Sequence, residues 1–184
     1  PSVKRKETVE KALSLNKKII EGFGLSRGLT HGEYIITGDK VYLIEIAARG
    51  AGVYISSDIV PLMTGLDTTS FIIDIATKEK VERPLIIHND KVVCYTAFFL
   101  PEGVVKSISG VEEVISKEYV HHNNLTLLNV GQKIKKNTDK TSRFFMVLEA
   151  DSMQVMNERI DFIKHTLQVE VQTEDQGLKG VIWK

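Results

Sequence analysis

The sequence predicts an α+β fold in two parts, residues 1–84 and residues 85–184. Three observations predict it. The first is a helical periodicity over residues 4–23, the second is a pair of strand-like runs around Gly38-Asp39-Lys40, and the third is a strand-rich stretch beyond Pro84. The first part is therefore expected to combine an antiparallel sheet with helices, and the second to be a small β-rich α+β domain.

Composition limits the classes of protein to which the chain can belong. Of its 184 residues, 42% are hydrophobic and 26% are charged, as in globular domains with an ordinary core. Lys plus Arg and Asp plus Glu both number 24, and the zero net charge argues against a nucleic-acid binder. Cys94 is the only cysteine, which excludes an internal disulfide and a cysteine-based zinc cluster. The start at Pro1, without Met and just before a helix, suggests a fragment.

No membrane or export signal is apparent in the sequence. No apolar run approaches the roughly 18 residues needed to span a bilayer. The first 20 residues are rich in Lys and Glu and lack the apolar centre of a signal peptide. A cytoplasmic protein is expected.

The first part opens with a helix and a hairpin. Apolar residues recur at helical spacing over residues 4–23, with Lys and Glu on the opposite side, and Gly22 and Gly24 end the pattern. Two runs rich in Ile, Val and Tyr follow, at residues 29–37 and 41–48. Such runs on either side of a Gly-Asp turn predict a β-hairpin.

Two short helices are expected after the hairpin. A glycine-bearing loop leads into the first, in which Ser56 or Ser57 is the N-cap, Pro61 occupies the first turn and Gly65 marks the end. Asp67 caps the second helix. The residues expected on its buried side are Phe71, Ile72 and Ile75.

The second part is expected to begin with another hairpin. Its strands are residues 92–100 and 104–108, joined by Pro101-Glu102-Gly103. His121 and His122, being adjacent, are expected to point to opposite faces of a strand or loop, where they cannot easily share a metal. The basic residues Lys133, Lys135 and Lys136 are interpreted as a solvated turn. A strand, a helix and a closing strand are expected at residues 144–149, 152–166 and 167–171.

The most informative feature is a pair of carboxylates on the first hairpin, Glu33 and Glu45. If a three-residue loop closed by Thr37 and Val41 joins the strands, the two carboxylates lie opposite each other on one face and repel. A divalent cation such as Mg²⁺, which takes one or two carboxylates, would turn that repulsion into a binding site. A two-residue turn closed by Thr37 and Lys40 would instead place them on opposite faces, and solvated surface carboxylates remain the alternative.

Further side chains accompany this pair. Strand alternation puts Ala47 and Arg49 on the side of Glu45, where the guanidinium fork suits a phosphate or carboxylate oxygen. His31 shares the face of Glu33, where it either lines the site or has a solvated or packed role.

One stretch of the first part resembles the metal-binding hairpin of the ATP-grasp superfamily: GLTHGEYIITGDKVYLIEIAARGAG. The superfamily includes biotin carboxylase, the carbamoyl phosphate synthetase large subunit, purine-pathway ligases and amino-acid ligases. In it, a Glu on one strand is followed on the next by Glu-x-Asn-x-Arg, a Gly-rich turn and a helix ending in Gly-x-Asp. The matching residues here are Glu33, Glu45, Arg49, Gly50, Gly52 and Gly65-Leu66-Asp67.

The resemblance has one departure and a limited extent. Ala47 stands where the family usually has an Asn whose amide oxygen binds a second metal. The similarity is clear over residues 4–78 and weaker beyond Pro84. There, Arg143 matches an Arg that opens a strand in the C-terminal domain of amino-acid-ligase-like members, and an ordinary surface charge at the start of a strand is the alternative. The resemblance implies the C-terminal half of an ATP-grasp domain followed by that small domain.

A reaction is implied by the same resemblance. Ligases of this family use ATP and Mg²⁺, or Mn²⁺ as an alternative ion, to activate a carboxylate as an acylphosphate, which an amine or another nucleophile attacks. By resemblance, Glu33 and Glu45 bind the metal and nucleotide, and Arg49 is catalytic. The substrate-binding residues implied are Arg49, Gly50, Gly52 and Arg143.

The implied partners are ATP, a small carboxylate, the N-terminal lobes of the same enzyme and a second copy in a homodimer, without nucleic acid or membrane. In the family the other lobe supplies the phosphate-binding lysines, a glycine-rich loop and the adenine hinge. The sequence shows no such elements before residue 30 and no Walker-type GxxxxGK, so the chain alone is expected to bind ATP poorly. Two alternatives remain: a non-catalytic interaction or binding module with an ATP-grasp-like fold, and a plain α+β domain with solvated carboxylates. The joint presence of Glu33, Glu45 and Arg49 favours the enzyme.

Overall fold

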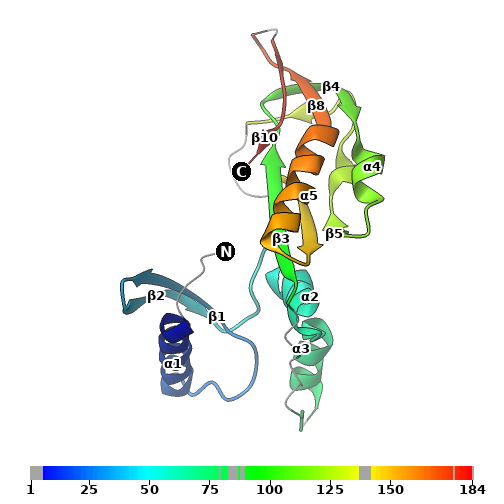
Figure 1. Cartoon of the computed structure of the whole chain (residues 1–184). Coiled ribbons are helices and arrows are strands. Elements are labelled where there is room, and N and C mark those ends of the chain that lie inside the picture. Colours follow the sequence, from blue (N-terminus) through cyan, green and yellow to red (C-terminus); the bar gives the residue numbers. More distant parts are fainter. Residues whose placement is uncertain are drawn as a thin grey trace. The chain divides into compact units, whose positions relative to one another are not determined.

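The computed structural model describes residues 6–78, 80–82, 87, 90–136, 142–175 and 177–183. They form helices and antiparallel sheets, which confirms the predicted α+β class (Figure 1). The chain divides into two compact units. Unit 1 comprises Pro1–Ser57 and Asp67–Leu85, and unit 2 comprises Asp58–Leu66 and Ile86–Lys184. The boundary predicted after Pro84 lies outside the described residues.

In unit 1, a long helix packs on a two-stranded hairpin (Figure 1). The Tyr34 hydroxyl donates a hydrogen bond of 2.7 Å to Asn16 Oδ1 and so joins hairpin to helix. Burial raises the pKa of the Tyr34 phenol. The regular elements are α1 (Lys6–Gly22), β1 (His31–Thr37), β2 (Lys40–Ala47) and α3 (Thr68–Thr77), and the π-helical turn η1 (Ile55–Ile59) begins in this unit.

Unit 1 has no fully buried apolar side chain among its described residues, and its two buried residues are Thr8 and Thr68. The predicted buried side of α3 is wrong for Ile72, which is 41% exposed, while Phe71 and Ile75 are half-buried. The reason is that α3 is not covered by a second layer within unit 1, so its apolar residues meet no core.

Unit 2 contains two four-stranded antiparallel sheets, one with the strand order β10-β3-β7-β5 and the other with the order β6-β4-β8-β9. Most of the elements predicted from local patterns are present. The predicted strand, helix and closing strand near residues 144–171 are confirmed as β7, α5 and β8. The elements are α2 (Val60–Thr64), β3 (Val92–Phe99), β4 (Gly103–Ser109), α4 (Val111–Ile115), β5 (Val120–Asn123), η2 (Leu125–Leu127), β6 (Lys133–Ile134), β7 (Phe144–Ala150), α5 (Met153–Thr166), β8 (Gln168–Gln172), β9 (Leu178–Lys179) and β10 (Ile182–Trp183).

The predicted hairpin of β3 with β4 is wrong. β3 pairs with β7 and β10, whereas β4 belongs to the other sheet and pairs with β6 and β8. The segment between them therefore carries the chain from one sheet to the next. Gly103 adopts φ 150° there, and a Cβ on it would lie 2.2 Å from the Gln172 carbonyl oxygen. Close approach of β8, rather than a hairpin turn, explains this glycine.

The core of unit 2 lies between its sheets and helix α5. Phe98 is fully buried, with its ring centroid 5.5 Å from that of Phe144 and 4.9 Å from that of Trp183. Trp183 comes from β10, so the end of the chain contributes to the core. Ser152 caps α5 by accepting a hydrogen bond from the Val155 amide at 3.2 Å.

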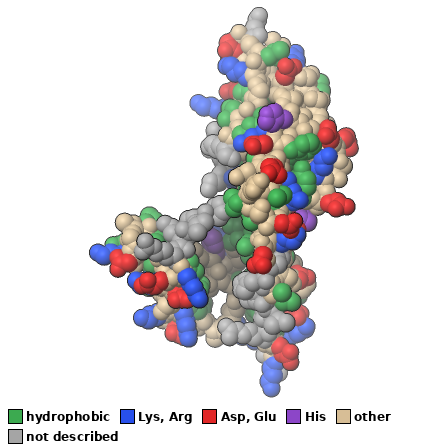
Figure 2. Space-filling view, in the orientation of Figure 1, with side chains coloured by type: hydrophobic (Ala, Val, Ile, Leu, Met, Phe, Trp, Pro, Cys, Tyr) green, Lys and Arg blue, Asp and Glu red, His purple; other side chains and the backbone are tan. Residues whose placement is uncertain are grey.

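Two further features concern the charged side chains on the surface and the length of the helices. On the face seen in Figure 2, acidic and basic side chains are interspersed over both units. None of the described helices is by itself long and apolar enough to cross a membrane. One pair, Ile55–Thr64 and Thr68–Thr77, meets that requirement only when joined across a bend of 110°.

Candidate functional site

The turn of the β1–β2 hairpin is the shorter of the two turns that the sequence left open. Thr37 pairs with Lys40, so the loop is the two-residue turn Gly38-Asp39 and not the three-residue loop closed by Thr37 and Val41. Gly38 has φ 61°, as a type II′ turn requires at its first central position. On its own, this turn would place Glu33 opposite residue 44 and would separate the two carboxylates.

A β-bulge restores the pairing of the carboxylates. Tyr34 pairs with Leu43 while Glu33 pairs with Glu45, which leaves Ile44 as the extra residue of β2. Directly opposed residues of an antiparallel pair share a face, so Glu33 and Glu45 lie on the same face. The juxtaposition expected from a three-residue loop is confirmed, although a two-residue turn combined with a bulge produces it.

The surroundings of the pair add few further ligand atoms. Both glutamates are exposed, and His31 Nε2 lies 3.3 Å from Glu33 Oε1. Ala47, directly opposite His31, adds no donor atom. Within the described residues no three His, Cys, Asp or Glu side chains come close enough to hold a metal. Two carboxylates are nevertheless a usual protein contribution to a Mg²⁺ site, in which phosphate and water complete the coordination.

The loop after β2 is shaped by glycine and by unusual backbone angles. A Cβ on Gly50 would lie 2.7 Å from Ser56 Oγ, whereas the space around Gly52 is open. Val53 and Tyr54 have φ values of 56° and 59°, and a left-handed conformation is rare for a β-branched residue such as Val. Such strain gathers at functional sites, and no signal in the sequence predicted it.

Arg49 lies at the start of this loop and is exposed. Its Nη1 donates a hydrogen bond of 2.9 Å to the Gly50 carbonyl oxygen. β2 ends at Ala47, one residue earlier than predicted, so Arg49 lies two residues beyond the strand, with its guanidinium hydrogen-bonded to its own loop. Its role toward a phosphoryl group stays a prediction.

The helix that follows the loop starts differently from the prediction. The π-helical turn η1 runs directly into α2, so the N-cap of α2 is Ile59 and no side chain caps it. The predicted cap at Ser56 or Ser57 is therefore wrong, because η1 already includes both serines. The predicted end is confirmed by Gly65, which has φ 68°.

Asp67 caps α3, as predicted. Its carboxylate accepts hydrogen bonds from the Ser70 amide at 3.0 Å and from the Ser70 hydroxyl at 2.6 Å. These bonds, the hydroxyl's first, hold the pKa of Asp67 below its ordinary value. The Thr68 hydroxyl donates to the Ser56 carbonyl oxygen, so the start of α3 is joined to η1.

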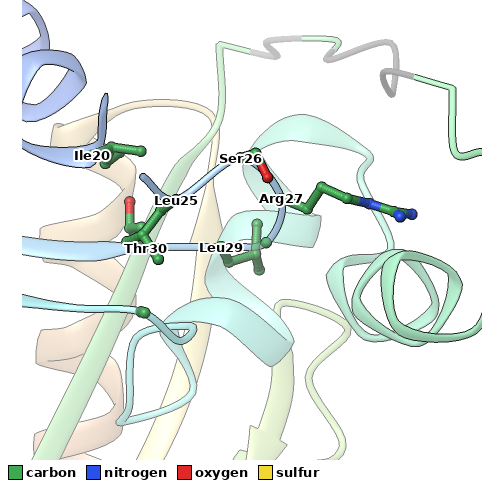
Figure 3. A pocket seen from close by; sticks show the side chains of 8 residues that line it. Ile20, Leu25, Ser26, Arg27, Leu29 and Thr30 are labelled. Carbon is green, nitrogen blue, oxygen red and sulfur yellow. The ribbon is translucent and has the colours of Figure 1, made fainter. Parts of the chain in front are cut away.

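A small cavity of about 180 Å³ in unit 1 is not a convincing ligand site. Its one charged lining residue, Arg27, extends away from the other labelled side chains (Figure 3). Arg27 Nη2 donates instead to the Lys78 carbonyl oxygen at 2.7 Å, at the C-terminal end of α3. The cavity is lined by Ile20, Leu25, Ser26, Arg27, Gly28, Leu29, Thr30 and Ala48.

A larger cavity of about 430 Å³ lies in unit 2 and contains Arg143. The Arg143 Cζ atom lies 5.2 Å from the centroid of the Tyr95 ring. Asn124 fixes the local backbone, because its Nδ2 donates to the Arg143 carbonyl oxygen at 3.2 Å and its Oδ1 accepts from the Phe145 amide at 2.8 Å. The residues lining the cavity are Asn124, Leu127, Gln132, Lys133, Ile134, Lys135, Lys136, Ser142, Arg143 and Phe144.

The three lysines of this cavity were interpreted from sequence as a solvated turn. Lys133 instead lies in β6 and pairs with Val104, and Lys135 and Lys136 directly follow that strand. All three are exposed, yet they line the same cavity as Arg143. Three lysines within four residues, a few positions before an arginine, were the available sequence signal.

His121 and His122 contact different partners on β5. His121 Nε2 lies 3.5 Å from Glu149 Oε2, whereas His122 Nδ1 lies 2.9 Å from Asp58 Oδ1. The prediction that the two histidines point apart is confirmed. The second contact ties the segment before α2 to β5 within unit 2.

Comparison with known proteins gives matches by structure only, because no family model and no curated protein matches the sequence. An L-amino acid ligase from Bacillus licheniformis matches with TM-score 0.70 and 19% identity, over 94% of this chain and 43% of that one. Phosphoribosylglycinamide synthetase from Anaerococcus prevotii matches with TM-score 0.66 and 14% identity, over 92% and 43%. N5-carboxyaminoimidazole ribonucleotide synthetase from Thermotoga maritima matches with TM-score 0.57 and 18% identity, over 92% and 44%.

These three enzymes are ATP-grasp ligases. The chain spans less than half the length of each of them, whereas each match covers more than nine tenths of this chain. At such low sequence identity the likeness concerns the fold. The chain shares its fold with a part of each of these ATP-grasp ligases.

Proposed function

We propose that this chain is the C-terminal portion of an ATP- and Mg²⁺-dependent ligase that activates a carboxylate as an acylphosphate for attack by an amine or another nucleophile. The observation that carries the proposal is the pairing of Glu33 with Glu45 across β1 and β2, on the fold of a ligase. Two like charges opposed on one face destabilise a hairpin, and a divalent cation between them removes that cost.

Glu33 and Glu45 would hold Mg²⁺, or Mn²⁺ as an alternative ion. Bound there, the ion would neutralise negative charge on the phosphate groups of ATP. Ala47 provides no side-chain oxygen, so a second ion would depend on water where related enzymes use an Asn. His31, hydrogen-bonded to Glu33, is placed to orient that carboxylate.

The proposed reaction has two steps, in which the remaining residues position the reacting groups. A carboxylate oxygen of the substrate bonds to the γ-phosphorus of ATP and ADP leaves. The nucleophile then bonds to the acyl carbon, and inorganic phosphate leaves. Arg49 would bind the phosphoryl oxygens through its fork, and the glycines at 50 and 52 would let the loop backbone approach the substrate. Arg143 would bind the substrate carboxylate.

The rest of the proposed enzyme would supply what this chain lacks. The matched structures are more than twice as long, and their remaining length is the expected source of the other nucleotide-binding lobe. A cytoplasmic location and a homodimer complete the proposal.

A metal titration of the chain itself tests the central assignment. Mn²⁺ broadens the NMR signals of nearby nuclei, so signals of β1 and β2 are expected to broaden first. Glu45→Gln keeps the shape of the side chain and removes one charge, and this selective broadening should disappear. Glu10→Gln, at an exposed position on α1, is the matched control and should leave it unchanged. Uniform broadening over all acidic surfaces would contradict a site at Glu33 and Glu45.

Turnover of the full-length enzyme tests the catalytic claim. Glu45→Gln is expected to lower kcat by roughly a hundredfold or more, because the metal loses a charged ligand. Stability without metal should not fall, since the repulsion between the two glutamates is relieved. Near-normal turnover at saturating Mg²⁺ would favour a non-catalytic module with this fold.

A further inference from the structure

The cavity in unit 2 is strongly basic. Among the described residues that line it, four are cationic and none is acidic: Lys133, Lys135, Lys136 and Arg143. Over the ranges that the structure describes, no Asp or Glu forms an ion pair with any of the four. Four cations around one cavity repel one another, and a bound anion would compensate them.

Other polar groups of this cavity are already used within the protein. The Asn124 side chain bonds to the backbone of β7, and Gln132 Oε1 accepts a hydrogen bond from the Asn129 amide at 3.1 Å. The cationic ends are therefore the main groups offered to a ligand. Leu127, Ile134 and Phe144 add apolar surface between them. A ligand with a short carbon chain and charged ends matches this lining.

The cations differ in how firmly they are held. Arg143 packs over the Tyr95 ring, and Asn124 fixes the Arg143 backbone, so this side chain is held more firmly than the lysines. Its planar fork suits a carboxylate. The lysines are exposed and carry flexible point charges, which suit a second anionic group without strict geometry. The volume of about 430 Å³ falls in the usual range for small-molecule sites.

We propose that this cavity selects a dianionic acid, with one carboxylate on Arg143 and a second anionic group on Lys133, Lys135 and Lys136. The second group is a carboxylate or a phosphate, which share the chemistry that the lysines recognise. The identification of this acid as the activated substrate rests on the proposed ligase function, whereas the binding itself does not.

NMR titration of the 184-residue chain at low ionic strength tests the proposal. The probes are succinate, with two carboxylates, and 2-phosphoglycolate, with a carboxylate and a phosphate. Butyrate, with one carboxylate, is the comparison. Signals of the cavity residues should shift with at least one dianion at roughly tenfold lower concentration than with butyrate. The tighter of the two dianions identifies the second group.

Two variants make the result specific. Lys135→Gln combined with Lys136→Gln is expected to remove most of the preference for the dianion and to leave the affinity for butyrate nearly unchanged. Lys164→Gln, on the exposed side of α5 and outside the cavity, should change neither affinity. Well-dispersed spectra of all variants confirm that they are folded.

Several outcomes separate this inference from the proposed function. Equal affinities for succinate, phosphoglycolate and butyrate would overturn it, as would an equal loss of affinity in Lys164→Gln, which would indicate attraction to the surface at large. Activity of the full-length enzyme on monocarboxylates, without preference for dianions, would reject the inference and keep the ligase. Selective dianion binding by a full-length protein without ligase activity would keep the cavity and reject the ligase.

Discussion

The two units of this chain bury their apolar residues to very different extents. In unit 2, Phe98, Met146 and Leu148 are inaccessible to solvent within one core. In unit 1, Leu13 and Phe23 are 63% and 71% exposed, and no apolar side chain of the described residues is fully buried. Unit 2 carries its own hydrophobic stabilisation, whereas the helix and hairpin of unit 1 have a surface of the kind that other protein usually covers.

The difference is measured most directly by truncating a phenylalanine in each unit. Phe98→Ala removes a side chain packed between Phe144 and Trp183 and should lower the free energy of unfolding of unit 2 by about 3–5 kcal/mol. Phe23→Ala removes an exposed side chain and should change stability by at most about 0.5 kcal/mol. Urea unfolding followed by Trp183 fluorescence measures the stability loss in Phe98→Ala. Circular dichroism measures the stability loss in both variants. Similar losses in the two variants would show that unit 1 has a core after all.

Substituting one arginine in each unit, Arg49 and Arg143, allows the functions of the two units to be compared. Arg49→Lys, in unit 1, keeps the charge and loses the bidentate fork, so turnover of the full-length enzyme should fall roughly tenfold for every carboxylate substrate. Arg143→Ala, in unit 2, should raise KM by different factors for different acids, by roughly ten- to a hundredfold, or about 1.5–3 kcal/mol.

Steady-state constants across a panel of carboxylic acids separate the two arginines. Uniform effects of both substitutions would mean that the units do not divide phosphoryl transfer and substrate selection. An Arg143→Ala enzyme with an unchanged KM on every active acid would make Arg143 a surface charge.

A smaller difference between the units concerns their helix caps, whose contributions to stability depend on pH in one unit and not in the other. Ser152, the cap of α5 in unit 2, does not titrate, and Ser152→Ala should cost about 1 kcal/mol of stability at any pH. Asp67, the cap of α3 in unit 1, has a pKa below the ordinary value of 3.8, chiefly because of the Ser70 hydroxyl. Its contribution is complete above pH 3.8 and is lost as the pH falls through the lowered value.

An NMR pH titration checks this sign. The Ser70 amide signal should move with a midpoint below 3.8, while Asp67→Asn, which keeps an oxygen acceptor, should abolish that movement. A midpoint at or above 3.8 would mean that the cap does not favour the charged carboxylate.

Local signals in the sequence predicted where α1, α3 and α5 lie, and predicted the long-range pairings poorly. The periodicity of α1 and the Asp67 cap of α3 act over a few residues, so they could be recognised without the fold. The β3–β4 hairpin was wrong because Pro101-Glu102-Gly103 has the composition of a turn. The partners of these strands, β7 and β8, lie some 45 to 70 residues away in sequence, and local composition does not encode that pairing.

The candidate site was likewise predictable only where a local sequence motif identifies its residues. The motif residues Glu33, Glu45 and Arg49 could be chosen by resemblance, and the structure confirms the cross-strand pairing of the glutamates. The left-handed backbone of Val53 and Tyr54 had no sequence signal, because neither residue favours it. The cavity at Arg143 was not predicted because its lysines lie in and directly after β6, whereas the arginine directly precedes β7, a strand of the other sheet.

The bulge at Ile44 has a consequence for recognising distant relatives of this hairpin. The glutamates are twelve positions apart only because β2 contains one residue more than β1 needs. A homologue with the same two-residue turn and no bulge would keep the carboxylates opposed at a spacing of eleven. A search pattern of fixed length would miss such a homologue, and an alignment would need its gap inside the second strand, where gaps are normally penalised.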